Sequence, residues 1–148
     1  MVAAAKRMAQ LMMQMSKFAR GEEGELHSKK DIIMTARRIV KESDEIVKMA
    51  KIVANSCTDK RLKRSVLQVI DKIPTIATQL KIIATVKATR SADDPESDKE
   101  ATEMLTDNAQ NLMKAVSEVL YATEAASIRV PPDSEAAKLG LRWIKRQR

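Results

Sequence analysis

The chain has 148 residues, 44% of them hydrophobic and 32% charged, which suits one compact domain around a single hydrophobic core. Only 2% are aromatic, glycines number three and prolines four, and strand-type alternation is absent, so we expect an all-α bundle and disfavour sheet-containing folds. No apolar run reaches the ~18 residues of a membrane-spanning helix. The formal net charge of +7 favours a polyanion or an acidic protein surface as partner.

Residues 2–20 are predicted to form the first helix, already in progress at its first residues and without a capping residue. Its apolar side chains recur at helical spacing on one face: Ala4, Met8, Leu11, Met12, Met15 and Phe18. Basic residues interrupt the segment, unlike the continuous apolar region of a secretory signal peptide. We therefore expect it to belong to the folded protein.

The second helix is predicted over residues 28–56, after a loop that contains glycine and glutamate. Ser28, followed three residues later by Asp31, is a variant of the capping box and marks its start. The apolar face is sustained over about six turns. It comprises Ile32, Ile33, Ala36, Ile39, Val40, Ile46, Val47, Ala50 and Val53.

A second face of the same helix carries a run of bases, which we call the basic ladder. It consists of Lys30, Arg37, Lys41, Lys48 and Lys51, with Lys29 close to its start, and among the acidic residues only Asp44 falls on this face. The ladder is either an ordinary solvated face or a strip that docks an acidic protein groove, phosphoinositide headgroups or nucleic-acid phosphates. Nucleic acid is the least favoured partner, because no aromatic residues are interleaved for base stacking.

The third helix is predicted over residues 58–89, starting at Thr58 and Asp59. Pro74 lies within it, and because the apolar phase resumes afterwards we expect a kink and not a clean break. The apolar stripe comprises Leu62, Val66, Val69, Ile73, Ile76, Ala77, Leu80, Ile83 and Ala84.

Two apolar residues of this helix fall outside that stripe. Ile82 and Val86 project beside Thr75 and Gln79, far around the helix from the core positions. Either they form an exposed apolar patch of the kind found in binding sites, or Pro74 re-phases the helix so that they join the core.

The fourth helix is predicted over residues 97–127, after a solvated connection at 90–96 and with Ser97 and Glu100 as its capping box. Its expected buried positions are Ala101, Met104, Leu105, Leu112, Met113, Val116, Val119 and Leu120. Pro131 and Pro132 prevent any continuation. The chain thus divides into an antiparallel four-helix bundle at 1–127 and an irregular C-terminal arm at 128–148, whose Leu141, Trp143 and Ile144 either dock on the bundle or stay available to a partner.

The residue types needed for catalysis do not cluster. His27 is the only histidine and Cys57 the only cysteine, and no metal-binding motif or phosphate-binding glycine loop is present. We therefore expect no enzyme activity, no cofactor and no metal. With one cysteine no internal disulfide can form, which favours a cytosolic setting, and Cys57 is expected to be a small hydrophobe.

Ten segments carry a family likeness in order along nearly the whole chain. They are Ala3–Met8, Ser43–Glu45, Cys57–Arg61, Ile73–Ile76, Thr78–Ile82, Thr85–Thr89, Ala101–Leu105, Asn108–Met113, Glu124–Ile128 and Leu141–Trp143. Together they resemble the tail domain of the vinculin/α-catenin family, on its vinculin side, because the α-catenin domain shares the Asn-Leu-Met stretch but few of the others.

The resemblance implies a non-catalytic module of a cytoskeletal adhesion linker. It implies binding to the sides of actin filaments (F-actin) and to acidic phosphoinositides, control by an autoinhibitory head domain, and self-association on filaments. The implied location is cytoplasmic, at the actin cytoskeleton, focal adhesions and adherens junctions, and peripheral at the plasma membrane. The alternative is a peripheral membrane module in which phosphoinositide binding through the ladder is the main activity.

The resemblance also assigns residues. The family's apolar actin contact corresponds to Ile82 and Val86, beside which lie Thr75 and Gln79, while Lys72 and Lys87 are expected to steer the domain toward acidic actin. The family's phosphoinositide contacts correspond to Lys29, Lys30, Arg37, Lys41, Lys48 and Lys51, with Lys145 and Arg146 as a further basic pair.

Three departures from the family pattern stand out. The family bundle has five helices, whereas this chain starts where the second would begin, so four are expected. The loop from Glu22 to His27 is longer and more acidic than in vertebrate tails. The arm lacks the aromatic residues that close the vertebrate tail, which leaves membrane insertion and filament cross-linking through it open.

Overall fold

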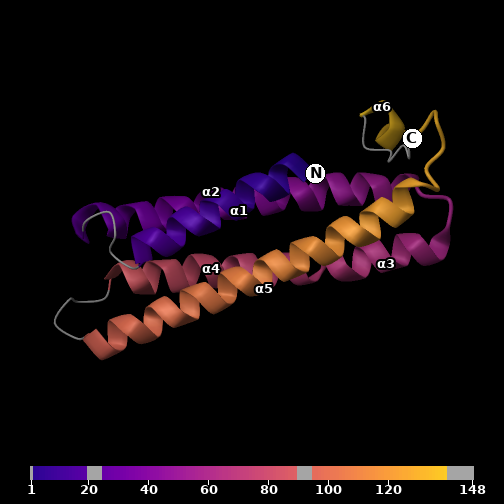
Figure 1. The fold of residues 1–148 in the computed structure, drawn as a ribbon. Coiled ribbons are helices and arrows are strands. Elements are labelled where there is room, and N and C mark those ends of the chain that lie inside the picture. Colours follow the sequence, from indigo (N-terminus) through magenta and orange to yellow (C-terminus); the bar gives the residue numbers. More distant parts are fainter. Residues whose placement is uncertain (1, 20–24, 90–94, 140–148) are drawn as a thin grey trace.

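A computed structural model describes residues 2–19, 25–89 and 95–139. Its helices are α1 (Val2–Ala19), α2 (Glu25–Ser56), α3 (Lys60–Ile70), α4 (Lys72–Thr89), α5 (Pro95–Ser127) and the short α6 (Glu135–Lys138). The long helices lie side by side, with α3 and α4 end to end in a single rod (Figure 1). No strand occurs in the described ranges. The expected all-α antiparallel bundle is confirmed.

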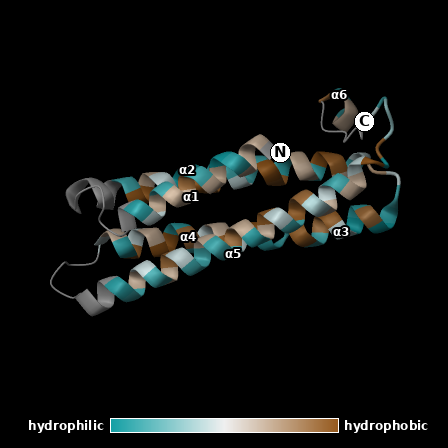
Figure 2. Ribbon diagram, in the orientation of Figure 1, coloured by the Kyte–Doolittle hydropathy of each residue, from teal (hydrophilic) through white to brown (hydrophobic). Residues whose placement is uncertain are grey.

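One continuous core runs along the bundle axis and receives side chains from every long helix. Methionines of α1 meet the branched residues of α2 to α5 there, and Figure 2 shows hydrophobic and hydrophilic segments alternating along each ribbon, as amphipathic helices require. The largest fully buried side chains are Met8, Met15, Ile32, Ile39, Ile46, Val53, Val66, Ile70, Ile73, Leu80, Leu105 and Leu112. The predicted apolar faces of the first three helices therefore point inward as expected.

The rod formed by α3 and α4 is interrupted at Asp71, three residues before Pro74. Proline has no backbone N–H for the carbonyl of Ile70, and its ring crowds that carbonyl, so the helical ladder fails one turn upstream of the proline. Asp71 nevertheless keeps helical angles (φ −59°, ψ −22°), and its N–H donates to the carbonyl oxygen of Leu67 at 3.3 Å. The rod therefore continues through the interruption without a clean break, as predicted, although it forms two helical segments; a bend at this point stays a prediction.

Two of the predicted helix starts are wrong and one is right. α2 begins at Glu25, three residues before Ser28, and α5 begins at Pro95, two residues before Ser97, so neither serine caps its helix. A glutamate suits the first turn through the helix dipole, and proline is pre-set for the first helical position. At α3, by contrast, the carboxylate of Asp59 accepts from the N–H groups of Arg61 (2.9 Å) and Leu62 (3.3 Å), as an N-cap does.

The arm is less irregular than predicted, because residues 128–139 fold back onto the bundle and include α6. The N–H and the hydroxyl of Thr58 donate to the carbonyl oxygen of Arg129 at 3.0 and 2.9 Å, and the N–H of Ala136 donates to Ser56 Oγ at 3.3 Å. Val130 and Ala136 are buried. The arm is thus attached where α2 passes into α3; Leu141, Trp143 and Ile144 lie outside the described residues.

Candidate functional site

The outer face of α4 carries the two apolar residues that periodicity placed outside the core. Ile82 is 58% exposed and Val86 is 38% exposed, while Leu80 and Ala84 beside them on the helix are fully buried. The predicted exposure of Ile82 and Val86 is therefore confirmed, while their role in binding stays a prediction. The alternative, in which Pro74 re-phases the helix and brings them inside, is wrong because the interruption at Asp71 leaves the core phase of α4 intact.

Three of the polar residues predicted to accompany this pair lie on the same face. Lys72, Thr75 and Gln79 are exposed, and with Ile82 and Val86 they follow one another at spacings of three and four residues. We call the five residues Lys72, Thr75, Gln79, Ile82 and Val86 the α4 strip. The strip is a polar and basic half followed by an apolar half.

Lys87 does not belong to the α4 strip, contrary to the sequence expectation. It is only 6% exposed, because it lies two helical turns after Leu80 and therefore points to the same buried side of α4. A lysine can occupy such a position because its four-carbon stem packs against apolar neighbours. Lys87 therefore contributes to the bundle and is not placed to attract an acidic partner.

Two side-chain contacts hold the α4 strip against α5. Lys72 Nζ lies 3.2 Å from Glu118 Oε2, and Asn108 Nδ2 donates to Gln79 Oε1 at 3.3 Å. The ion pair is solvent-exposed and contributes little to folding, although it partly neutralises the one base of the strip. The Asn108 contact is more enclosed, since that asparagine is buried between the helices.

Sequence reasoning missed one exposed residue near this face. Met104 was predicted to be buried in α5, but it is 48% exposed. Glu118, Asn111 and Met104 are spaced by seven residues and are all partly or largely exposed, so they share one stripe at the edge of the helix. That spacing is present in the sequence and could have identified the position.

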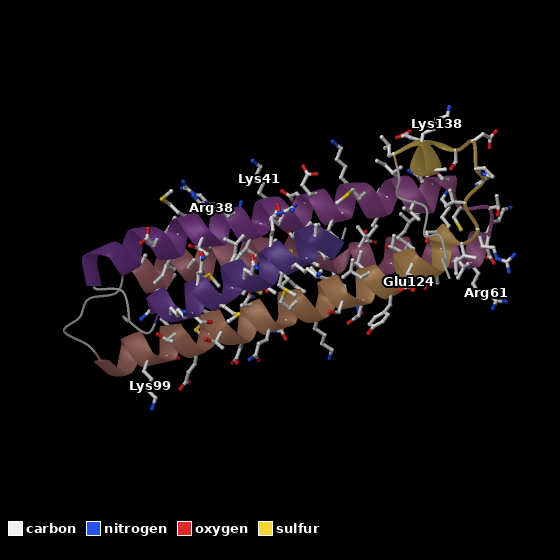
Figure 3. The ribbon with its side chains drawn as sticks, turned by 45° about the horizontal axis from the view of Figure 1, so that its top comes forward. Arg38, Lys41, Arg61, Lys99, Glu124 and Lys138 are labelled. Atoms are coloured by element: carbon white, nitrogen blue, oxygen red, sulfur yellow. The ribbon has the colours of Figure 1, made fainter. Side chains whose placement is uncertain are left out.

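The basic ladder occupies the outer side of α2. Its members Arg37, Lys41, Lys48 and Lys51 are all exposed, as is Asp44 among them. Figure 3 shows Lys41 projecting outward together with Arg38, a further base that the sequence reading did not include. The side chains of Lys29 and Lys30, and both Lys145 and Arg146, lie outside the described residues.

A contact between α1 and α2 keeps one acid away from the ladder. The guanidinium Nε of Arg7 donates to Glu42 Oε2, and this hydrogen bond raises the pKa of Arg7 against the opposing effect of burial. Glu42 follows Lys41 in sequence, but its carboxylate is paired with a base of another helix. Among the described residues Asp44 remains the one acid on the ladder face, where the exposed bases Arg37, Lys41, Lys48 and Lys51 outnumber it.

The described residues offer no reactive centre. No group of three or more histidine, cysteine, aspartate or glutamate residues in that part of the chain could hold a metal ion. Cys57 is half-buried, with its thiol 3.5 Å from the carbonyl oxygen of Asp59, as suits a small hydrophobe at a helix boundary. Among the described helices none is long and apolar enough to cross a membrane.

The sequence matches the Vinculin family over residues 1–148. The chain belongs to the vinculin family. It is 49% identical to vinculin of Oscarella pearsei over 94% of this chain and 16% of that protein, and 49% identical to vinculin of Homo sapiens over 98% of this chain and 12% of that protein. A solved structure of a vinculin homolog from a sponge has a TM-score of 0.83 and 48% identity, covering 92% of this chain and 17% of the other.

These matches settle the broad class of the protein. Vinculin proteins are structural proteins of the cytoskeleton at cell adhesions, and the chain belongs with them by sequence and fold. It spans 12% to 16% of the length of the sponge and human relatives. The shared fold extends to almost the whole of this chain.

Proposed function

We propose that this chain is the tail module of a vinculin-type linker and binds the sides of actin filaments through the α4 strip. The observation that supports this most is the exposure of Ile82 and Val86, one turn apart on a helix whose other isoleucine and leucine residues are buried or half-buried. Apolar side chains left uncovered on a bundle become binding anchors when a partner covers them.

The composition of the strip suits a filament surface. The apolar half supplies area that is removed from water on contact, while Thr75, Gln79 and Lys72 supply hydrogen-bond donors at its edge. The net charge of +7 favours encounter with an acidic filament, and this attraction should weaken as salt screens it. The apolar contact should depend much less on salt.

A second activity, binding of acidic phosphoinositides, is supported by the ladder. Arg37, Lys41, Lys48 and Lys51 are exposed on α2, and the nearest acid in sequence, Glu42, is occupied by Arg7. Juxtaposed bases of this kind bind anionic headgroups with about 1 kcal/mol each near a membrane surface. The ladder and the α4 strip lie on different helices, so each can be altered without changing the other.

The remaining assignments follow from the same proposal. An autoinhibitory head domain in the full-length protein would compete for the tail, self-association would occur on filaments, and the protein would act at focal adhesions and adherens junctions on the cytoplasmic side of the plasma membrane. In this scheme the tail connects adhesions to actin, and the ladder recruits it to the membrane.

Filament co-sedimentation tests the proposal directly. The chain should pellet with actin filaments, and vesicles of phosphatidylcholine with a few per cent phosphatidylinositol bisphosphate, added as competitor, show whether lipid and filament exclude each other. Vesicles of phosphatidylcholine alone are the control. Absence of the chain from the filament pellet at low and at physiological salt would refute the filament proposal, and absence of vesicle binding would refute the lipid proposal.

A further inference from the structure

The packing of α4 against α5 has a defined register, because two side-chain contacts join the two helices. Lys72 meets Glu118, and Gln79 meets Asn108, so Glu118 and Asn108 mark the flank of α5 that faces α4. These contacts also show which residues of the two antiparallel helices lie level with each other. The residues of α5 that lie next to the α4 strip can therefore be identified from their positions relative to Asn108 and Glu118.

Met104 lies on that flank of α5. At about 100° per residue, position 104 projects about 40° from position 108 in one direction and about 40° from position 118 in the other. It thus falls between the two residues that contact α4. Met104 is half-exposed, whereas its neighbour Leu105 is fully buried, so the methionine side chain is at the surface on the flank of α5 that faces α4.

Met104 is also level with the apolar half of the α4 strip. Val86 lies fourteen residues after Lys72, and Met104 lies fourteen residues before Glu118. In antiparallel helices both steps advance about 21 Å in the same direction. Around α4, Val86 projects within about 20° of Gln79 and 40° of Lys72, so it lies on the flank of α4 that faces α5.

We propose that Met104 is the third apolar anchor of the filament-binding surface, which then spans α4 and α5. The inference rests on the proposed function, because it names a further contact residue of the same site. It adds an exposed apolar side chain of α5 to the exposed pair Ile82 and Val86 of α4. An unbranched thioether suits this position, since methionine adapts its shape to an irregular partner surface.

The test compares two methionines that are both exposed but lie on different faces. Met104→Gln replaces the thioether with a polar group of similar length, and Met13→Gln makes the same change on α1, where Met13 is 66% exposed. α1 packs on α2 and α5 and is not part of the α4 strip. Filament affinity is measured by co-sedimentation and thermal unfolding by circular dichroism, with Ile82→Ala/Val86→Ala as the reference for loss of the strip.

Met104→Gln should weaken filament binding about three- to tenfold, Met104→Leu should weaken it less, and Met13→Gln should leave it unchanged. The two glutamine variants should unfold at similar temperatures. Equal affinities of Met104→Gln and Met13→Gln would overturn the role of Met104 while leaving the strip intact. Weaker binding that comes with a much lower unfolding temperature in Met104→Gln would also overturn it, as the residue would then act through the fold. If Ile82→Ala/Val86→Ala binds filaments like the unaltered chain, the proposed function itself fails and this inference with it.

Discussion

Truncating the exposed pair, Ile82→Ala/Val86→Ala, should weaken filament binding while leaving the chain folded. The change removes three carbons from one side chain and two from the other, at about 0.8 kcal/mol for each when fully buried. The structure leaves 58% of Ile82 and 38% of Val86 uncovered, and this is the share that a filament can still cover. The loss of binding free energy is therefore about 2 kcal/mol, or roughly a 30-fold rise in Kd.

The same fractions set the expected effect on stability. The part of each side chain already covered accounts for a loss of unfolding free energy of at most about 2 kcal/mol for the pair, whereas the single truncation of fully buried Leu80 to Ala should cost about 2–5 kcal/mol. Urea unfolding followed by circular dichroism measures both. The double variant should remain folded under the conditions of the binding assay.

Ile128→Ala is the matched control, because Ile128 is an isoleucine of similar exposure (53%) in the arm, directly after the last residue of α5. Co-sedimentation over a range of actin concentrations gives Kd for the unaltered chain, the control and the double variant. The control should bind as the unaltered chain does. A folded double variant with less than about a threefold change in Kd, or an equal loss in the control, would show that exposed apolar area on α4 is not what binds the filament.

Three further predictions concern charged residues. Lys41→Glu/Lys48→Glu should greatly weaken binding to phosphoinositide vesicles, measured by vesicle co-sedimentation at two salt concentrations. Its filament affinity should fall less than that of Ile82→Ala/Val86→Ala. A larger loss of filament affinity in the lysine variant than in the apolar variant would favour the membrane module. Lys87→Glu should lower the free energy of unfolding by about 3 kcal/mol, since it places a carboxylate where a lysine is buried. The control Lys81→Glu, on the exposed side of α4, should change the free energy of unfolding by less than about 0.5 kcal/mol. Equal urea midpoints for the two variants would contradict the buried position of Lys87. Glu118→Gln should leave stability within about 1 kcal/mol, and by freeing Lys72 it should strengthen filament binding at low salt; weaker binding there would show that the ion pair itself is needed.

Helical periodicity was sufficient to predict most of the fold, because the bundle has one core and each long helix turns one face toward it. The same periodicity separated Ile82 and Val86 from the core, since two residues opposite a sustained stripe cannot be buried in a bundle of this size. The α3 start was predictable too, because Asp59 caps it through its own side chain and requires nothing from the rest of the protein.

The errors come from positions at the edges of the helix faces, where neighbouring helices decide burial. Met104 is apolar and adjoins the core stripe of α5. Its side chain, however, lies on the flank of α5 next to α4, and α4 covers it only partly. Lys87 is charged, yet its register with Leu80 was readable and its stem is long enough to be packed inside. α2 and α5 begin at Glu25 and Pro95, before Ser28 and Ser97, although serine has the stronger preference for the capping position. Each serine therefore lies inside its helix and not at its start.

The attachment of the arm determines how a mechanical load would enter the bundle. Residues 128–139 leave α5 and are fastened to the turn between α2 and α3 by Thr58 and Ser56. Tension applied beyond residue 139 therefore meets these hydrogen bonds and the buried Val130 and Ala136 before it can peel α5 from its end. In a linker that transmits force, this attachment distributes the tension over α2, α3 and α5 together.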